Sequence, residues 1–109
     1  MDYSAFIEGI NTKSEKAWGK LYDHYYASLC SYVEKFLGDA GIAEDIVQEC
    51  LIKMWNTSVT FPDVKSLSAW LYKSVYHASV SVLREKKLLE RFQENWNEMQ
   101  VSDEETAQE

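Results

Sequence analysis

The chain has 109 residues, of which 46% are apolar and 27% are charged, and this composition is typical of one globular domain. The apolar runs are too short for a transmembrane helix, the N-terminus lacks the regions of a signal peptide, and two cysteines are too few for a disulfide scaffold. We therefore expect a cytoplasmic protein without membrane insertion. Four glycines and one proline supply few turns for a β-fold, so we expect an all-α protein.

The first two predicted elements are a short helix and a long one. Residues 3–10 carry apolar side chains four apart, which predicts a short N-terminal helix. Thr12 and Glu15 match a capping box, in which each side chain accepts a hydrogen bond from a free backbone N–H. Apolar residues then recur at steps of three or four up to Leu37. Gly38 follows and predicts a left-handed residue that ends the helix.

Two further long helices are predicted. Asp39 is expected to cap the second of the three long helices, which ends at residues 56–58. Residues 59–65 form a loop. The third begins near Ser66. We expect the three long helices and the short one to pack as a compact bundle. Its expected core is Trp18, Leu21, Tyr25, Leu29, Phe36, Ile46, Val47, Cys50, Leu51, Met54, Leu71, Val75 and Ala78.

The phase of the apolar pattern shifts beyond Arg84. A second stripe then appears at spacings of three and four residues, and residues 101–109 are acidic, small and polar, which indicates a disordered tail. We expect a helical domain over residues 1–91 and a helix end with an acidic linker over 92–109. The second stripe consists of Leu89, Phe92, Trp96 and Met99.

The net charge of −7 is unevenly distributed. Residues 1–60 have a net charge of −4, residues 61–91 of +3 and residues 92–109 of −6. In the basic segment, rings alternate with cations, as a surface for single-stranded nucleic acid requires, although ordinary helix surfaces carry such residues too. The cations are Lys65, Lys73, Arg84, Lys86, Lys87 and Arg91, and the rings are Tyr72, Tyr76 and His77.

A second candidate surface is the acidic and amide face formed by Asp45, Gln48 and Glu49. These side chains supply acceptors about one helical turn apart, which suits a partner helix with arginines, although a merely solvated face has the same pattern. No catalytic motif is present, and the carboxylates lack the Glu-x-x-His partner of a di-iron site. We therefore expect neither an enzyme nor a metal or other cofactor.

Three segments together resemble a known family. The stretch Ala43–Trp55, AEDIVQECLIKMW, is similar to the second conserved region of bacterial RNA polymerase sigma factors, and most similar to the extracytoplasmic-function (ECF) group, in which it reads AEDIVQEvFlklW. LYDHYY at 21–26 resembles the first helix of that group. SLSAWLYK at 66–73 and LREKK at 83–87 resemble its third helix and the end of that helix.

The resemblance implies a sigma-factor domain that binds core RNA polymerase and recognises and opens the promoter −10 element. It assigns the polymerase contact, made with the clamp helices of the β′ subunit, to Asp45, Gln48, Glu49 and Lys53. An anti-sigma factor is a further partner that the family suggests. The implied promoter-DNA contacts are Lys65, Trp70, Tyr72, Lys73, Tyr76, His77, Arg84, Lys86 and Lys87.

The chain departs from the family pattern at three positions. Tyr76 stands where the family usually has a basic or small residue. His77 stands where the family usually has Asn, and Ser81 where it usually has Asp. An imidazole presents its donor and acceptor differently from an amide, so base preference is expected to differ. The family continues into a helix-turn-helix domain, and we expect this chain to be an isolated first domain. Two alternatives stay open: a helical module that binds a regulator without DNA, and a duplex-binding domain with a major-groove helix.

Overall fold

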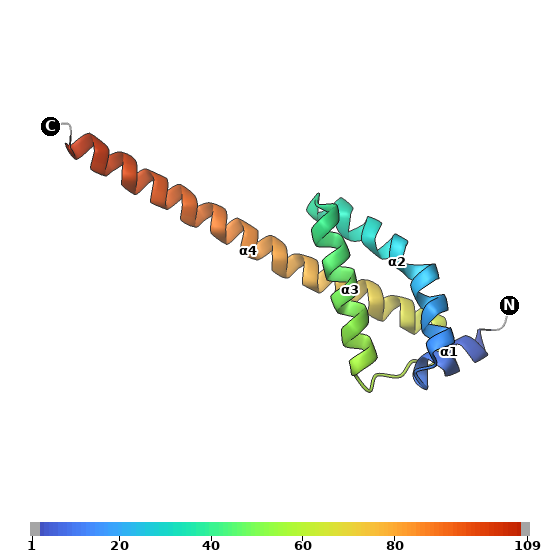
Figure 1. Cartoon of the computed structure of the whole chain (residues 1–109). Coiled ribbons are helices and arrows are strands. Elements are labelled where there is room, and N and C mark those ends of the chain that lie inside the picture. The colour runs from blue at the N-terminus through green and yellow to red at the C-terminus, as the bar shows by residue number, and fades with distance from the viewer. Residues whose placement is uncertain (1–2, 108–109) are drawn as a thin grey trace. The chain divides into compact units, whose positions relative to one another are not determined.

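The computed structural model describes residues 3–107, with side chains up to Glu98. It contains four helices, α1 (Ser4–Asn11), α2 (Glu15–Leu37), α3 (Ala40–Asn56) and α4 (Val64–Ala107), and no strand occurs within 3–107 (Figure 1). The predicted all-α class is therefore confirmed. The chain divides into two units, Met1–Ser79 and Val80–Glu109, so that α1, α2, α3 and the first part of α4 belong to the first unit. No helix in the described part is long and apolar enough to cross a membrane.

The start of α2 differs from the prediction. Ser14 is its N-cap and accepts a hydrogen bond from the backbone N–H of Ala17 at 3.4 Å. The predicted capping box of Thr12 and Glu15 is wrong, because the Thr12 hydroxyl turns back and donates to the carbonyl oxygen of Glu8 at 2.9 Å. Thr12 thus closes α1 instead of opening α2.

The turn between α2 and α3 follows the prediction. Gly38 has φ +73°, a left-handed conformation that glycine adopts without a Cβ clash, and its N–H bonds to the Glu34 carbonyl at 2.6 Å. Asp39 caps α3 by accepting a hydrogen bond from the N–H of Ile42 at 3.0 Å. These adjacent signals reverse the chain, so that α2 and α3 run from a shared turn (Figure 1), and the two helices pack against each other.

The bounds of α4 are wider than predicted. The helix begins at Val64 because the Asp63 carboxylate accepts the N–H of Ser66 at 2.8 Å and so caps the first turn. It continues to Ala107, where residues 101–107 were predicted as disordered tail. That prediction is wrong for the described backbone, and the reason is that no glycine or proline follows Pro62 to interrupt the helix.

The core lies in the first unit and agrees with the prediction at most positions. Trp18 and Ala78 are only half-buried, and Phe36 is 41% exposed, so these three are not core residues. Ser79 replaces Ala78 because the buried positions of α4 advance by four residues after Val75. The buried residues that the prediction missed are Ile7, Ile10, Ala17, Val33, Ala43, Phe61, Leu67 and Ser79.

Two long-range contacts hold the beginning of α4. The amide of Asn11, at the end of α1, donates to the carbonyl oxygen of Phe61 and accepts from its N–H, both at 2.8 Å. The Tyr25 hydroxyl on α2 forms a hydrogen bond with the hydroxyl of Ser68 on α4. The loop before α4 and the first turns of that helix are thereby fixed to α1 and α2.

Candidate functional site

The α3 face, which we define as Asp45, Gln48, Glu49 and Lys53, is exposed at all four positions. These residues lie opposite the buried stripe of α3, so the amphipathic pattern of the helix turns them to solvent. Gln48 is positioned by α2, because its amide donates to the Tyr26 hydroxyl at 3.2 Å. The face therefore presents acceptors beside one cation.

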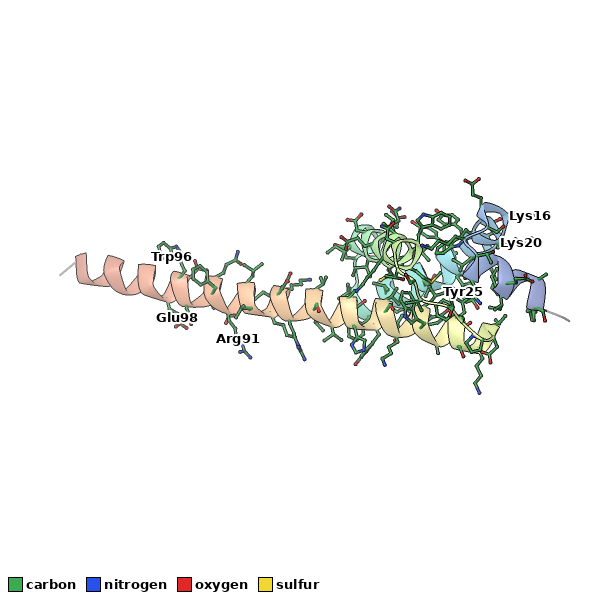
Figure 2. All side chains as sticks on the ribbon, turned by 90° about the horizontal axis from the view of Figure 1, so that it is seen from below. Lys16, Lys20, Tyr25, Arg91, Trp96 and Glu98 are labelled. Atoms are coloured by element: carbon green, nitrogen blue, oxygen red, sulfur yellow. The ribbon has the colours of Figure 1, made fainter. Side chains whose placement is uncertain are left out.

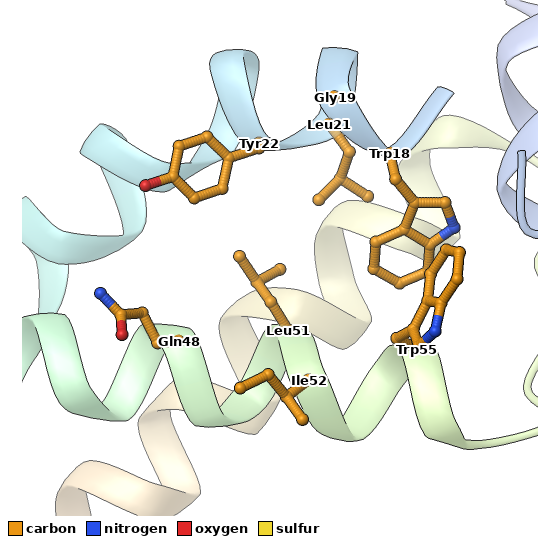
Figure 3. A pocket seen from close by; sticks show the side chains of 8 residues that line it. All are labelled: Trp18, Gly19, Leu21, Tyr22, Gln48, Leu51, Ile52 and Trp55. Carbon is orange, nitrogen blue, oxygen red and sulfur yellow. The ribbon is translucent and has the colours of Figure 1, made fainter. Parts of the chain in front are cut away.

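An apolar groove of about 450 Å³ lies between α2 and α3 and reaches the α3 face at Gln48 (Figure 3). Trp18 and Trp55 form its end, with their rings edge to face at 4.8 Å and 83°. Ile52, an apolar residue on the polar side of α3, is 60% exposed. The groove places apolar surface next to the acceptors. Its lining is Trp18, Gly19, Leu21, Tyr22, Gln48, Leu51, Ile52 and Trp55.

The α4 ring surface, which we define as Lys65, Trp70, Tyr72, Lys73, Tyr76 and His77, belongs to the first unit. Lys65, Lys73, Tyr76 and His77 are exposed, whereas Trp70 and Tyr72 are half-buried. Trp70 packs on Phe61 with ring centroids 5.9 Å apart, so part of its ring supports the loop before α4.

The rings on α4 also contact aromatic rings near the end of α2 and each other. Tyr72 meets Tyr32 edge-on at 5.3 Å, and Tyr76 meets Phe36 at 5.9 Å and His77 at 5.7 Å. The interpretation of Phe36 as core hid this contact. Tyr32 and Phe36 lie in the last turns of α2, on either side of the buried Val33 in the sequence.

Arg84, Lys86 and Lys87, the remaining predicted DNA contacts, lie in the second unit. All three are exposed on α4, and their role stays a prediction. The α4 ring surface and these three cations are parts of one continuous helix in the chain, α4.

The surroundings of the two cysteines do not indicate a reactive thiolate. Desolvation by burial is the main cause that raises the pKa of both Cys30 and Cys50. Both thiols therefore stay protonated at neutral pH. No group of three His, Cys, Asp or Glu side chains among the described residues could hold a metal ion.

Comparison with known proteins identifies the family. The sequence profile of sigma-70 region 2 matches residues 21–88. The chain is 40% identical over 69 residues to the ECF RNA polymerase sigma factor SigL of Mycobacterium tuberculosis, a match that covers 62% of this chain and 39% of the relative. It is 29% identical over 84 residues to the ECF RNA polymerase sigma factor SigK of Mycobacterium ulcerans, covering 76% of this chain and 45% of the relative.

A third relative, the ECF RNA polymerase sigma factor SigW of Bacillus subtilis, is 26% identical over 81 residues, covering 74% of this chain and 43% of the relative. The chain thus spans less than half the length of these relatives. No solved structure gives a significant match. The matched range includes α3, most of α2 and the first part of α4, and on this ground the chain belongs to the sigma-70 region 2 family, as its resemblance to the ECF group predicted.

Proposed function

We propose that this domain binds core RNA polymerase through the α3 face and unpaired promoter −10 DNA through α4. The relatives are named RNA polymerase sigma factors, which supports a polymerase partner for the chain. The single observation that carries the proposal is that two chemically different surfaces lie on two different helices, α3 and α4. Exposed acceptors lie on α3 at Asp45, Gln48 and Glu49, and exposed rings and cations lie on α4 at Lys65, Lys73, Tyr76 and His77.

On the polymerase side, the proposed partner is the pair of clamp helices of the β′ subunit. Carboxylates of Asp45 and Glu49 and the amide of Gln48 accept hydrogen bonds from basic side chains, and charge-assisted bonds of this type are the strong ones. The apolar groove, which Trp18, Ile52 and Trp55 help to line, adds apolar area beside these acceptors. An anti-sigma factor that covered the same face would block polymerase binding. We propose that the chain acts in the cytoplasm.

On the DNA side, Lys65 and Lys73 neutralise backbone phosphates while the ring of Tyr76 stacks on an unpaired base. His77 takes the position at which the family has Asn, and we propose that this exchange changes the base preference. Arg84, Lys86 and Lys87 extend the phosphate contacts along the helix. This arrangement has no catalytic step, and we propose no enzymatic activity.

The proposal is tested by the affinity of the full chain for core RNA polymerase. Replacing Gln48 and Glu49 together by alanine is expected to weaken binding at least tenfold, since the two side chains lie in the middle of the α3 face. Asp23→Ala, which removes an exposed carboxylate from α2, is the matched control and should leave the affinity unchanged. Equal affinities for the wild type, the double variant and the control would refute the polymerase assignment.

A second candidate function is a helical module that binds a regulatory protein without DNA. The apolar groove beside the α3 face favours it, because such a groove accepts an apolar side chain of a partner helix whether or not α4 touches DNA. Binding of a single-stranded oligonucleotide by the chain, weakened by Tyr76→Ala by about 1–3 kcal/mol, distinguishes the sigma role from this module.

A further inference from the structure

Four aromatic rings meet on one surface of the first unit, two from α2 and two from α4. Tyr32 contacts Tyr72 with ring centroids 5.3 Å apart and an interplanar angle of 89°. One turn further along both helices, Phe36 contacts Tyr76 at 5.9 Å and 59°. Tyr32 is 38% exposed, Phe36 41% and Tyr76 43%, so these pairs form a surface and not a buried cluster.

The interior of the bundle does not need these rings. Val33 on α2 and Leu71 and Val75 on α4 are completely buried, so the interior is built from these aliphatic side chains. The rings lie outside that layer. Edge-on and tilted contacts between rings use the edge of one ring and leave ring faces available to a further flat group.

The exposed lysines on the same two helices favour a nucleic-acid strand as the further group. Lys35 precedes Phe36 on α2, Lys73 follows Tyr72 on α4, and both lysines are exposed. The carboxylate of Glu34 is the exposed acid on the same turn of α2. Exposed rings and exposed lysines on the same two helices match the needs of a single strand, whose bases stack while its phosphates are neutralised.

We propose that Tyr32 and Phe36 of α2 join Tyr72 and Tyr76 of α4 in a stacking platform for unpaired DNA bases. The inference rests on the proposed function and extends it, since it adds α2 to a contact that the sequence and the family assign to α4 alone. The occupant is a base of a single strand, and the second helix gives that strand two ring pairs to stack on instead of one.

The test compares two oligonucleotides with the same number of phosphates, a strand of twelve thymidines and an abasic strand of equal length. We expect the full chain to bind the thymidine strand more tightly. Phe36→Leu and Tyr32→Leu should each lower its affinity for that strand about 5- to 150-fold, the range measured for loss of base stacking, and leave its affinity for the abasic strand unchanged. Phe36→Tyr keeps a ring and should bind like the wild type.

Tyr3→Leu is the matched control, because Tyr3 is a 51% exposed ring on the first unit outside the platform. Circular dichroism melts check that each variant keeps the fold. If Tyr76→Leu weakens binding while the Tyr32 and Phe36 variants do not, the platform is overturned and the proposed function stands. If the wild type binds both strands equally, stacking is absent and the platform is overturned. If it binds neither strand, even with polymerase, the proposed DNA function fails too.

Discussion

Replacing Asn11 by alanine is expected to destabilise the domain by removing the clamp between α1 and the loop before α4. The Asn11 side chain both donates to and accepts from the backbone of Phe61, at 2.8 Å each, across 50 residues of sequence. Each hydrogen bond contributes about 0.5–1.5 kcal/mol net, and part-buried backbone groups lose their partners in the variant. The expected loss in the free energy of unfolding is therefore about 1–3 kcal/mol.

Urea denaturation followed by circular dichroism measures this loss. Asn56→Ala is the matched control, because Asn56 is an exposed asparagine at the end of α3, and exposed substitutions usually change stability by less than about 0.5 kcal/mol. Asn11→Asp should be destabilising as well, since its carboxylate keeps the acceptor but faces the Phe61 carbonyl without a donor. A loss for Asn11→Ala no larger than that of the control would refute the clamp.

Three smaller predictions concern the helix ends and the thiols. Gly38→Ala should destabilise the domain by about 1–2 kcal/mol in thermal melts, because φ is +73° there, and an unchanged melt would contradict the left-handed turn. Cys30 should react with a thiol reagent before Cys50, since Cys50 is buried and Cys30 only half-buried, and simultaneous labelling would argue against this order. Hydrogen bonds from Ser66 hold the pKa of Asp63 below its ordinary value, so its stabilisation is present above the unfolded-state pKa and lost as pH falls through the folded one. Asp63→Asn should therefore reduce the acid sensitivity of unfolding, and identical acid titrations of both proteins would count against it.

Local signals in the sequence predicted the architecture where they act over a few residues. Gly38 and Asp39 ended one helix and began the next as expected, because a left-handed glycine and an N-cap aspartate work within one turn. The predicted capping box at Thr12 was wrong because two hydroxyl residues, Thr12 and Ser14, lie near the start of the helix. The sequence pattern alone does not decide which of them caps it.

Contacts between distant segments were beyond the sequence pattern. Periodicity identified Phe36 as an apolar position but not its place at the end of α2, where the ring meets Tyr76 instead of the core. The Asn11 clamp pairs two segments that no periodicity connects. By contrast, the α3 face was predictable as exposed, because Asp45, Glu49 and Lys53 follow one another at steps of four residues on the side opposite the buried stripe, with Gln48 next to Glu49.

The central claim is that α3 serves the polymerase and α4 serves the DNA. Its most direct test measures both affinities, for core RNA polymerase and for a non-template −10 oligonucleotide in the presence of polymerase, with two sets of variants. The Gln48→Ala, Glu49→Ala double variant should lose polymerase affinity at least tenfold, whereas Tyr76→Ala should keep it and lose oligonucleotide affinity. Loss of both affinities by the same amount in both variants, or of neither, would contradict the account.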